Sequence, residues 1–259
     1  MTTLSKIRFE DKNNSWNVWK KQKGANERSI KRVQKKLPEM EASKQLVKIL
    51  KKIYKKNDKI LDFGCAAGHY YNSIKRLNKN IKYTGFDVIK EYIDFAKKFF
   101  LKNKNVFFDI QSIFKLNKKY FKKFDIVFCC NVLLHLPSID LPLKNLLSAS
   151  KKFVIIRTLV SKNTHLSRFY YDESKDKSGY LNNFQFQNTY SYNLIKEKIN
   201  KLGKFNIQFI DDIFDGNKIN KEFTKKNIKK YPGLTKYIQG MQIAGSKVFE
   251  FKWIIIKKI

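Results

Sequence analysis

Short apolar segments alternate with helical segments along residues 46–156, and this alternation restricts the fold more than any other feature of the chain. Strands that alternate with helices form parallel βαβ units with right-handed crossovers. We therefore expect an α/β protein with a Rossmann-like, doubly wound sheet. The expected strands of this part of the chain are Lys59–Phe63, Ile81–Phe86, Val106–Phe108, Asp125–Cys129 and Phe153–Ile156.

The regular alternation ends after the fifth expected strand. Residues 158–190 are polar and aromatic without clear periodicity, whereas Phe205–Ile210 and Val248–Ile256 have the composition of further strands. Residues 1–37 are polar and have no strong apolar pattern. We expect a lead-in segment at 1–37, followed by one domain at 38–259 with an insertion at about 158–190.

The formal net charge of +33 is compatible with a polyanionic partner such as nucleic acid. Most of this charge comes from lysines spread along the chain, whereas phosphate recognition favours the arginine fork. An A/T-rich base composition of the genome, whose codons encode many lysines, therefore competes with a dedicated polyanion site as the explanation of the charge. The arginines are Arg8, Arg28, Arg32, Arg76, Arg157 and Arg168.

Several classes of protein are excluded by composition. No stretch approaches the roughly 20 apolar residues of a membrane span, and the polar N-terminus lacks a secretory signal. Cys65, Cys129 and Cys130 form neither a disulfide framework nor a spaced metal-ligand set, so we expect no metal. We expect a cytoplasmic protein without a membrane span, and the sequence predicts no oligomeric state.

Residues that could bind a ligand follow the expected strands directly. In an open parallel sheet, ligands bind at the carboxyl ends of the strands. The first strand leads into Asp62-Phe-Gly-Cys-Ala-Ala-Gly68, where the two glycines let the backbone approach a ligand and the next helix offers free N–H groups. The next strands end at Asp87, Asp109 and Asn131. We expect these ends to form one site.

This arrangement resembles the class I S-adenosylmethionine-dependent methyltransferases over about residues 58–157. The segment Ile60–Gly68 is similar to their first motif, with Ala66 in place of the middle glycine. The segment Asp125–Pro137 is similar to their fourth-strand motif. The resemblance implies S-adenosylmethionine as cofactor, S-adenosylhomocysteine as product, and a sheet of seven strands whose last strand, Val248–Ile256, is antiparallel.

The resemblance also implies roles for individual residues. Asp87 would bind the ribose hydroxyls, Val88 would pack beside the adenine, and Asp109 to Gln111 would meet the adenine amino group. The fourth strand end would line the methionine part of the cofactor and the acceptor pocket. The implied cofactor-binding residues are Asp62, Gly64, Cys65, Ala66, Gly68, Asp87, Val88, Asp109, Ile110, Gln111, Asn131 and Val132.

A nicotinamide or flavin enzyme is the main alternative on the same fold. Its fingerprint, G-x-G-x-x-G, differs from Gly64-Cys-Ala-Ala-Gly68, and an acid two residues before the first glycine favours the methyltransferase interpretation. Asp87 suits ribose in both cases and does not discriminate. Methyl transfer from a sulfonium depends mainly on alignment and exclusion of water, and a base is needed only if the acceptor must lose a proton.

Three further features have both a functional and a structural interpretation. His135 could be a catalytic base for a hydroxyl acceptor or a scaffold residue at a helix start. The aromatic residues of the insertion could form a lid over the acceptor or a satellite hydrophobic cluster. Trp16 and Trp19 could close over the site or simply dock the lead-in. Asp211 and Asp212 are expected at the surface.

Three functions are compatible with these patterns. The first is O- or N-methylation of a small-molecule or glycan acceptor, favoured by the segment Asn131–His135. The second is methylation of RNA, favoured by the basic charge and the interleaved aromatic residues. The third is a cofactor-binding module without catalysis, which the presence of Asp87 disfavours.

Overall fold

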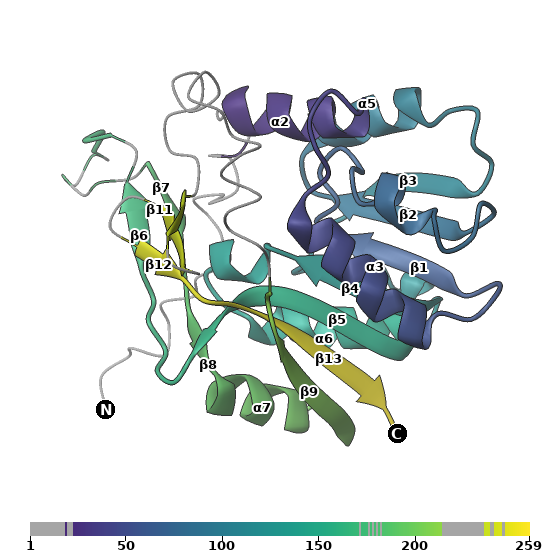
Figure 1. Ribbon diagram of the computed structural model, residues 1–259. Helices are drawn as coiled ribbons and strands as arrows, with labels where there is room; N and C mark the ends of the chain where they lie inside the picture. Colours follow the sequence, from purple (N-terminus) through teal and green to yellow (C-terminus); the bar gives the residue numbers. More distant parts are fainter. Residues whose placement is uncertain are drawn as a thin grey trace.

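The computed structural model describes Trp19 and residues 23–170, 172–175, 177, 179, 181, 183–213, 236–238, 241–244 and 247–259. At its centre, strands follow the order β3-β2-β1-β4-β5-β13-β9, and the short β8 pairs with β5 outside this path (Figure 1). Neighbours from β3 to β5 are parallel, whereas β13 is antiparallel to β5 and β9. The expected Rossmann-like sheet with an antiparallel final strand is confirmed. These strands are β1 (Lys59–Phe63), β2 (Lys82–Asp87), β3 (Val106–Ile110), β4 (Phe124–Cys130), β5 (Ser150–Ser161), β8 (Tyr190–Ser191), β9 (Phe205–Asp211) and β13 (Phe251–Lys258).

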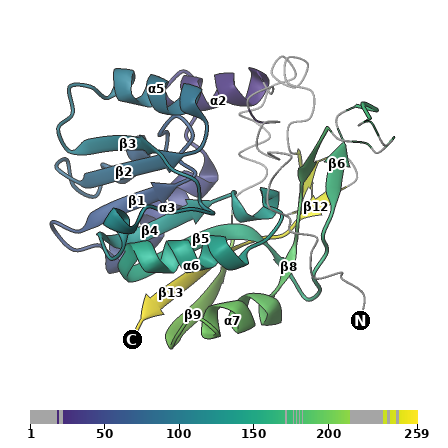
Figure 2. The ribbon, with the colours of Figure 1, turned by 180° about the vertical axis from the view of Figure 1, so that it is seen from behind.

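Helices cover both faces of the sheet, as Figures 1 and 2 show from opposite sides. One hydrophobic core lies under α3, α4 and α5, and the second lies under α6 and α7. The adjacent Cys129 and Cys130 belong to different cores because successive side chains of a strand point to opposite faces. The helices are α2 (Lys23–Val33), α3 (Glu41–Ile53), α4 (Tyr71–Ile74), α5 (Lys90–Phe99), α6 (Asp140–Ala149) and α7 (Tyr192–Asn200).

The structure differs from the sequence-based expectation mainly after the fifth parallel strand. β5 continues to Ser161 instead of ending near Ile156. The segment that follows contains an antiparallel hairpin of β6 and β7, and a small three-stranded sheet lies near the end of the chain. Short 3₁₀ turns, η2 and η3, flank β4. These elements are η2 (Lys118–Tyr120), η3 (Leu133–His135), β6 (Arg168–Tyr170), β7 (Phe184–Phe186), β10 (Lys236–Ile238), β11 (Met241–Ala244) and β12 (Lys247–Phe249).

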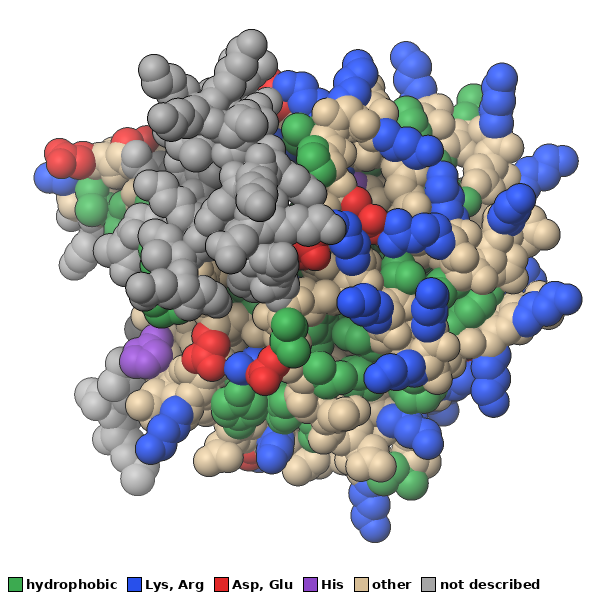
Figure 3. Space-filling view, viewed as in Figure 1, with side chains coloured by type: hydrophobic (Ala, Val, Ile, Leu, Met, Phe, Trp, Pro, Cys, Tyr) green, Lys and Arg blue, Asp and Glu red, His purple; other side chains and the backbone are tan. Residues whose placement is uncertain are grey.

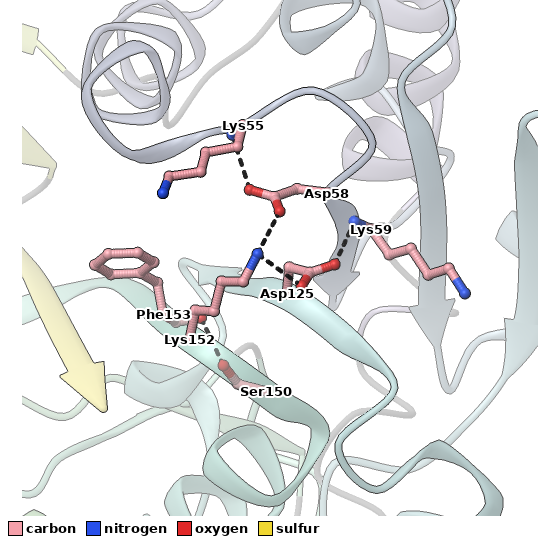
Figure 4. Close-up of polar contacts among 7 residues, drawn as sticks. All are labelled: Lys55, Asp58, Lys59, Asp125, Ser150, Lys152 and Phe153. Atoms are coloured by element: carbon pink, nitrogen blue, oxygen red, sulfur yellow. Dashed lines mark hydrogen bonds and ion pairs between the residues drawn. The ribbon is translucent and has the colours of Figure 1, made fainter. Parts of the chain in front are cut away.

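A charged cluster ties the amino ends of β1, β4 and β5 together (Figure 4). The ammonium of Lys152 lies 2.6 Å from an Asp58 oxygen and 3.0 Å from an Asp125 oxygen. The backbone N–H groups of Lys55 and Lys59 donate to Asp58 and Asp125, respectively. Although burial alone raises the pKa of Asp125, these hydrogen bonds and the Lys152 charge lower it overall. Because this cluster occupies the amino edge of the sheet, the opposite, carboxyl edge is the one available to a ligand.

Lysine and arginine side chains project at many separate points from the described part of the face that Figure 3 shows. They do not gather into a single patch on that face. None of the helices in the described part of the chain is long and apolar enough to cross a membrane.

Candidate active site

A cavity of about 520 Å³ opens where β1, β2 and β4 end, beneath α2. This volume lies in the range of roughly 300–1,000 Å³ that is typical of small-molecule sites. A larger groove of about 730 Å³ between α3 and β9 is lined by aliphatic side chains and lysines, and it contains none of the expected site residues. The cavity at the strand ends is therefore the candidate active site. Its walls include Gly64, Ala66, Asp87, Gln111, Asn131 and His135.

The glycine-rich turn after β1 forms one wall of the cavity. The N–H groups of Gly64 and Cys65 both donate to the Phe86 carbonyl, at 2.7 and 2.9 Å. Gly64 has a φ of +85°, and a Cβ atom there would lie 2.3 Å from a methyl group of Val132. Glycine is therefore required at this position by backbone conformation and by space.

Asp87 connects the end of β2 to this turn. Its carboxylate accepts hydrogen bonds from the N–H groups of Ala66 at 2.8 Å and Ile89 at 3.0 Å. Burial raises the pKa of Asp87, although these backbone N–H groups oppose the shift. The carboxylate lines the cavity and has lone pairs left to accept hydrogen bonds from a diol.

The expected cofactor residues divide into two groups. Gly64, Ala66, Asp87, Val88, Gln111, Asn131 and Val132 line the cavity. The residues that do not line it are Asp62, Cys65, Gly68, Asp109 and Ile110. Asp62 is buried and accepts a hydrogen bond from the Tyr83 hydroxyl at 2.7 Å, and burial raises its pKa well above the usual value. The Asp109 carboxylate accepts hydrogen bonds from the side chains of Gln111 and Tyr120, so it holds Gln111 in the cavity wall.

Helix α2 supplies residues that the sequence interpretation missed. Arg28, Ser29 and Arg32 line the cavity, as does Trp19. The Ser29 hydroxyl accepts from the Ala67 N–H at 3.2 Å, which attaches the helix to the glycine-rich turn. The lead-in lacks a clear apolar pattern, but two of the few arginines stand four residues apart and would share a helix face. This spacing of the two arginines is the sequence feature that could have indicated a functional face on this helix.

His69 presents unsatisfied polar atoms at the cavity wall. Both ring nitrogens are buried and lack a hydrogen-bond partner among the described residues. Burial and the nearby Arg32 charge lower the pKa of His69 to about 3, so the imidazole is neutral. A neutral imidazole can both donate and accept, and buried polar groups are normally hydrogen-bonded. The wall therefore suits a ligand with polar groups, as the methionine part of S-adenosylmethionine has.

The end of β4 is held by a buried ion pair. Arg157 donates to the Asn131 side-chain oxygen at 2.5 Å and forms a two-pronged ion pair with Asp212. The Asp212 side chain is only 2% exposed, so the expectation that it lies at the surface is wrong, whereas Asp211 is exposed as expected. Asp212 is buried because β13 brings the end of β9 close to Arg157.

His135 lies on the η3 turn at the cavity wall. Its Nδ1 atom is 2.9 Å from the Phe186 carbonyl on β7, and the Trp19 ring packs edge-on at 4.8 Å. Burial lowers the pKa of His135 to about 4, although the hydrogen bond to Phe186 opposes the shift. The side chains of Asn188 and Tyr190 donate hydrogen bonds to backbone carbonyl groups of the same turn, so the insertion holds His135 in place.

Of the other aromatic residues of the insertion, Tyr171 and Tyr180 lie outside the described residues, as does Trp16 of the lead-in.

No group of three His, Cys, Asp or Glu residues that could hold a metal ion occurs in the described part of the chain. Cys65, Cys129 and Cys130 are buried free thiols, and burial raises the pKa of each. The described cavity therefore offers hydrogen-bonding groups and one carboxylate to a ligand, rather than a cluster of metal ligands.

Comparisons with known proteins agree with this geometry. A family model described as a methyltransferase domain matches residues 54–226. A tRNA U34 carboxymethyltransferase of Helicobacter pylori (strain G27) is 32% identical over 100 residues, which cover 37% of this chain and 38% of that protein. The Helicobacter acinonychis (strain Sheeba) protein with the same name is 35% identical over 99 residues, covering 36% and 37%. The chain thus spans less than two fifths of the length of these relatives.

Solved structures with low sequence identity share the fold. An S-adenosylmethionine-dependent methyltransferase from Thermotoga maritima is similar at a TM-score of 0.52 and 15% identity, over 94% of this chain and all of that one. Magnesium protoporphyrin IX methyltransferase from Synechocystis PCC 6803, solved with bound S-adenosylmethionine, is similar at a TM-score of 0.50 and 14% identity, over 84% and 78%. The chain therefore belongs to the methyltransferase-domain family.

Proposed function

We propose that the cavity binds S-adenosylmethionine and that the protein methylates a small-molecule or glycan acceptor. The observation that carries the cofactor site is the position of Asp87, which lines the cavity and bonds the glycine-rich turn. Its carboxylate would accept the ribose hydroxyls, with Val88 and Gln111 on the adenine side. Arg32 would contact the methionine carboxylate, and the neutral His69 ring would accept a hydrogen bond from the ammonium. The cofactor supplies a methyl group on a positively charged sulfur.

The residues of this chain would contribute orientation and a dry environment. Helix α2 covers the cavity, and Ser29 attaches it to the glycine-rich turn, so water would be excluded from one side. His135, on the wall near the end of β4, would accept a proton from an acceptor that must lose one. The pKa of about 4 keeps its imidazole neutral, and therefore able to accept, at physiological pH.

RNA is the second candidate acceptor. The curated relatives carry tRNA in their names, and lysine and arginine side chains project at many points from the face drawn in Figure 3. Against this candidate, Arg28 and Arg32 line the cavity and Arg157 is buried. The exposed Arg76 is paired with Glu39, and the exposed Arg168 lies over the Phe184 ring. We therefore place the small-molecule or glycan acceptor first. We further propose a cytoplasmic location, and one domain at 38–259 that follows a lead-in segment at 1–37.

The first test is a calorimetric titration of the purified protein with S-adenosylmethionine and S-adenosylhomocysteine. Saturable binding of both at micromolar concentrations would support the proposed site. A folded protein that binds neither would contradict it. Titration with total tRNA at two salt concentrations separates the acceptors, because phosphate-driven binding weakens steeply with salt. Strong, salt-sensitive binding of tRNA would move RNA to first place.

A further inference from the structure

Two side chains at the cavity wall have fixed hydrogen-bonding directions, and together they favour one class of acceptor. We propose that the methyl acceptor is a hydroxyl group, held between the side-chain amide of Asn131 and Nε2 of His135. This inference rests on the proposed function and narrows its acceptor from oxygen or nitrogen to oxygen.

The orientation of the Asn131 amide follows from its neighbour. A guanidinium has only N–H donors, so the atom of Asn131 that faces Arg157 at 2.5 Å must be the carbonyl oxygen. Arg157 is 5% exposed and does not line the cavity, whereas Asn131 does. The NH₂ group is thus the end left to face the cavity, and it has no partner among the described residues.

Arg157 is itself held on several sides. Its guanidinium is paired with the buried Asp212 and lies 3.8 Å from the centre of the Phe251 ring. The Trp253 indole also donates to Asp212, at 3.2 Å. In addition, the Asn131 N–H donates to the Arg157 carbonyl at 2.8 Å, with Asn131 at a φ of +60°. Arg157 and Asp212 are therefore positioning residues that prevent the Asn131 amide from turning over.

The tautomer of His135 is fixed by the insertion. A backbone carbonyl can only accept, so the Nδ1 atom that lies 2.9 Å from the Phe186 oxygen must carry the proton. The other nitrogen, Nε2, then has a lone pair and no partner among the described residues. Because Asn188 and Tyr190 donate hydrogen bonds to backbone carbonyl groups of Leu136 and Leu133, the turn that places His135 at the cavity wall is fixed.

A hydroxyl group matches this pair of fixed groups. One oxygen lone pair accepts from Asn131, the O–H donates to His135, and the second lone pair is left to attack carbon. In the transfer, the oxygen gains the methyl carbon and the electrons of the broken bond stay on sulfur. The hydroxyl proton passes to Nε2 and then to solvent. An amine would lack acceptors here for its remaining N–H bonds, because the Asn131 end that faces it donates.

The first test needs no substrate. In protein labelled with ¹⁵N at histidine, proton–nitrogen correlation spectra distinguish protonated from bare ring nitrogens, and His135→Gln assigns the signal among the three histidines. We expect Nδ1 protonated and Nε2 bare at pH 7, with S-adenosylhomocysteine bound. A protonated Nε2 would overturn the inference. Failure of S-adenosylhomocysteine to bind would instead count against the proposed function.

The second test identifies the atom that is methylated. The protein is incubated with ¹³C-methyl-labelled S-adenosylmethionine and the metabolite and RNA fractions of a bacterial extract, and the ¹³C shift of the product distinguishes O-methyl from N-methyl. An O-methyl product in the metabolite fraction supports a small acceptor, and one in RNA supports a ribose hydroxyl. A predominant N-methyl product overturns the inference.

The third test uses an isosteric variant. Asn131→Asp keeps an oxygen toward Arg157 but removes both N–H donors, so we expect O-methylation to fall at least about tenfold with little change in S-adenosylhomocysteine affinity. Arg157→Lys should raise the acceptor KM more than it lowers kcat, because a positioning group is lost. Asp211→Asn, next to the buried pair but exposed, is the matched control and should behave as wild type. Undiminished O-methylation by Asn131→Asp would contradict the proposal.

Discussion

Substitution of Gly64 by alanine should destabilise the protein by two separable effects. A φ of +85° costs a residue with a Cβ roughly 1–2 kcal/mol. The new Cβ would also lie 2.3 Å from a Val132 methyl group, far inside contact distance, and overpacking of this kind costs about 1–3 kcal/mol. We therefore expect a loss of about 2–5 kcal/mol in the free energy of unfolding.

A double-mutant cycle with Val132→Ala isolates the steric part, since it removes the methyl group that the new Cβ meets. Urea unfolding of the four proteins should give a favourable coupling of at least about 1 kcal/mol. Gly179→Ala is the control for backbone strain alone, because its φ is +82° and its added Cβ meets nothing within 4 Å. A coupling within about 0.5 kcal/mol of zero would refute the close contact between the glycine-rich turn and Val132.

Three other changes test the site and the frame. Asp87→Ala should weaken S-adenosylmethionine binding by about 1–3 kcal/mol in calorimetry, and unchanged affinity would mean that the ribose site is elsewhere. As the pH is lowered, kcat/KM should decrease with a midpoint near pH 4 and not near 6.5. The reason is that burial lowers the pKa of His135 to about 4 and only the neutral ring accepts a proton. Lys152→Met should cost about 1–2 kcal/mol of stability at pH 7 by leaving Asp58 and Asp125 without their cation. The pKa of Asp125 is lowered in the folded protein, so this carboxylate contributes fully to stability above its usual pKa, and the contribution is lost as the pH falls. The difference in stability between Lys152→Met and wild type should therefore shrink below about pH 4.

Much of the fold could be predicted because the pattern that specifies it is local. Each parallel strand is a short apolar run followed by a turn, and parallel strands place their carboxyl ends at one edge. The strand-end residues Gly64, Asp87 and Asn131 therefore meet at one cavity, as expected. The strand boundaries follow less closely, since β5 extends five residues beyond its last strongly apolar run, to Ser161.

The parts that could not be predicted depend on contacts between distant segments. Asp212 is polar and follows a half-buried strand, so the residues next to it in the sequence predict that it is exposed at the surface. It is buried because β13 lies between β5 and β9 and brings Arg157 to it. Likewise, the role of α2 as the cover of the cavity depends on single contacts such as Ser29 with Ala67, which no periodicity records.

The place of β13 in the sheet has a consequence for the order in which the protein matures. This strand is translated after every other strand of the central sheet, yet it lies between β5 and β9 and pairs with both. Its Phe251 and Trp253 also enclose the Arg157–Asp212 pair beneath Asn131. On the ribosome, β1 to β5 can assemble early, but the Asn131 side of the cavity must wait for β13 to leave the exit tunnel. A nascent chain of this protein could thus acquire the proposed cofactor pocket before it acquires the proposed means to hold an acceptor.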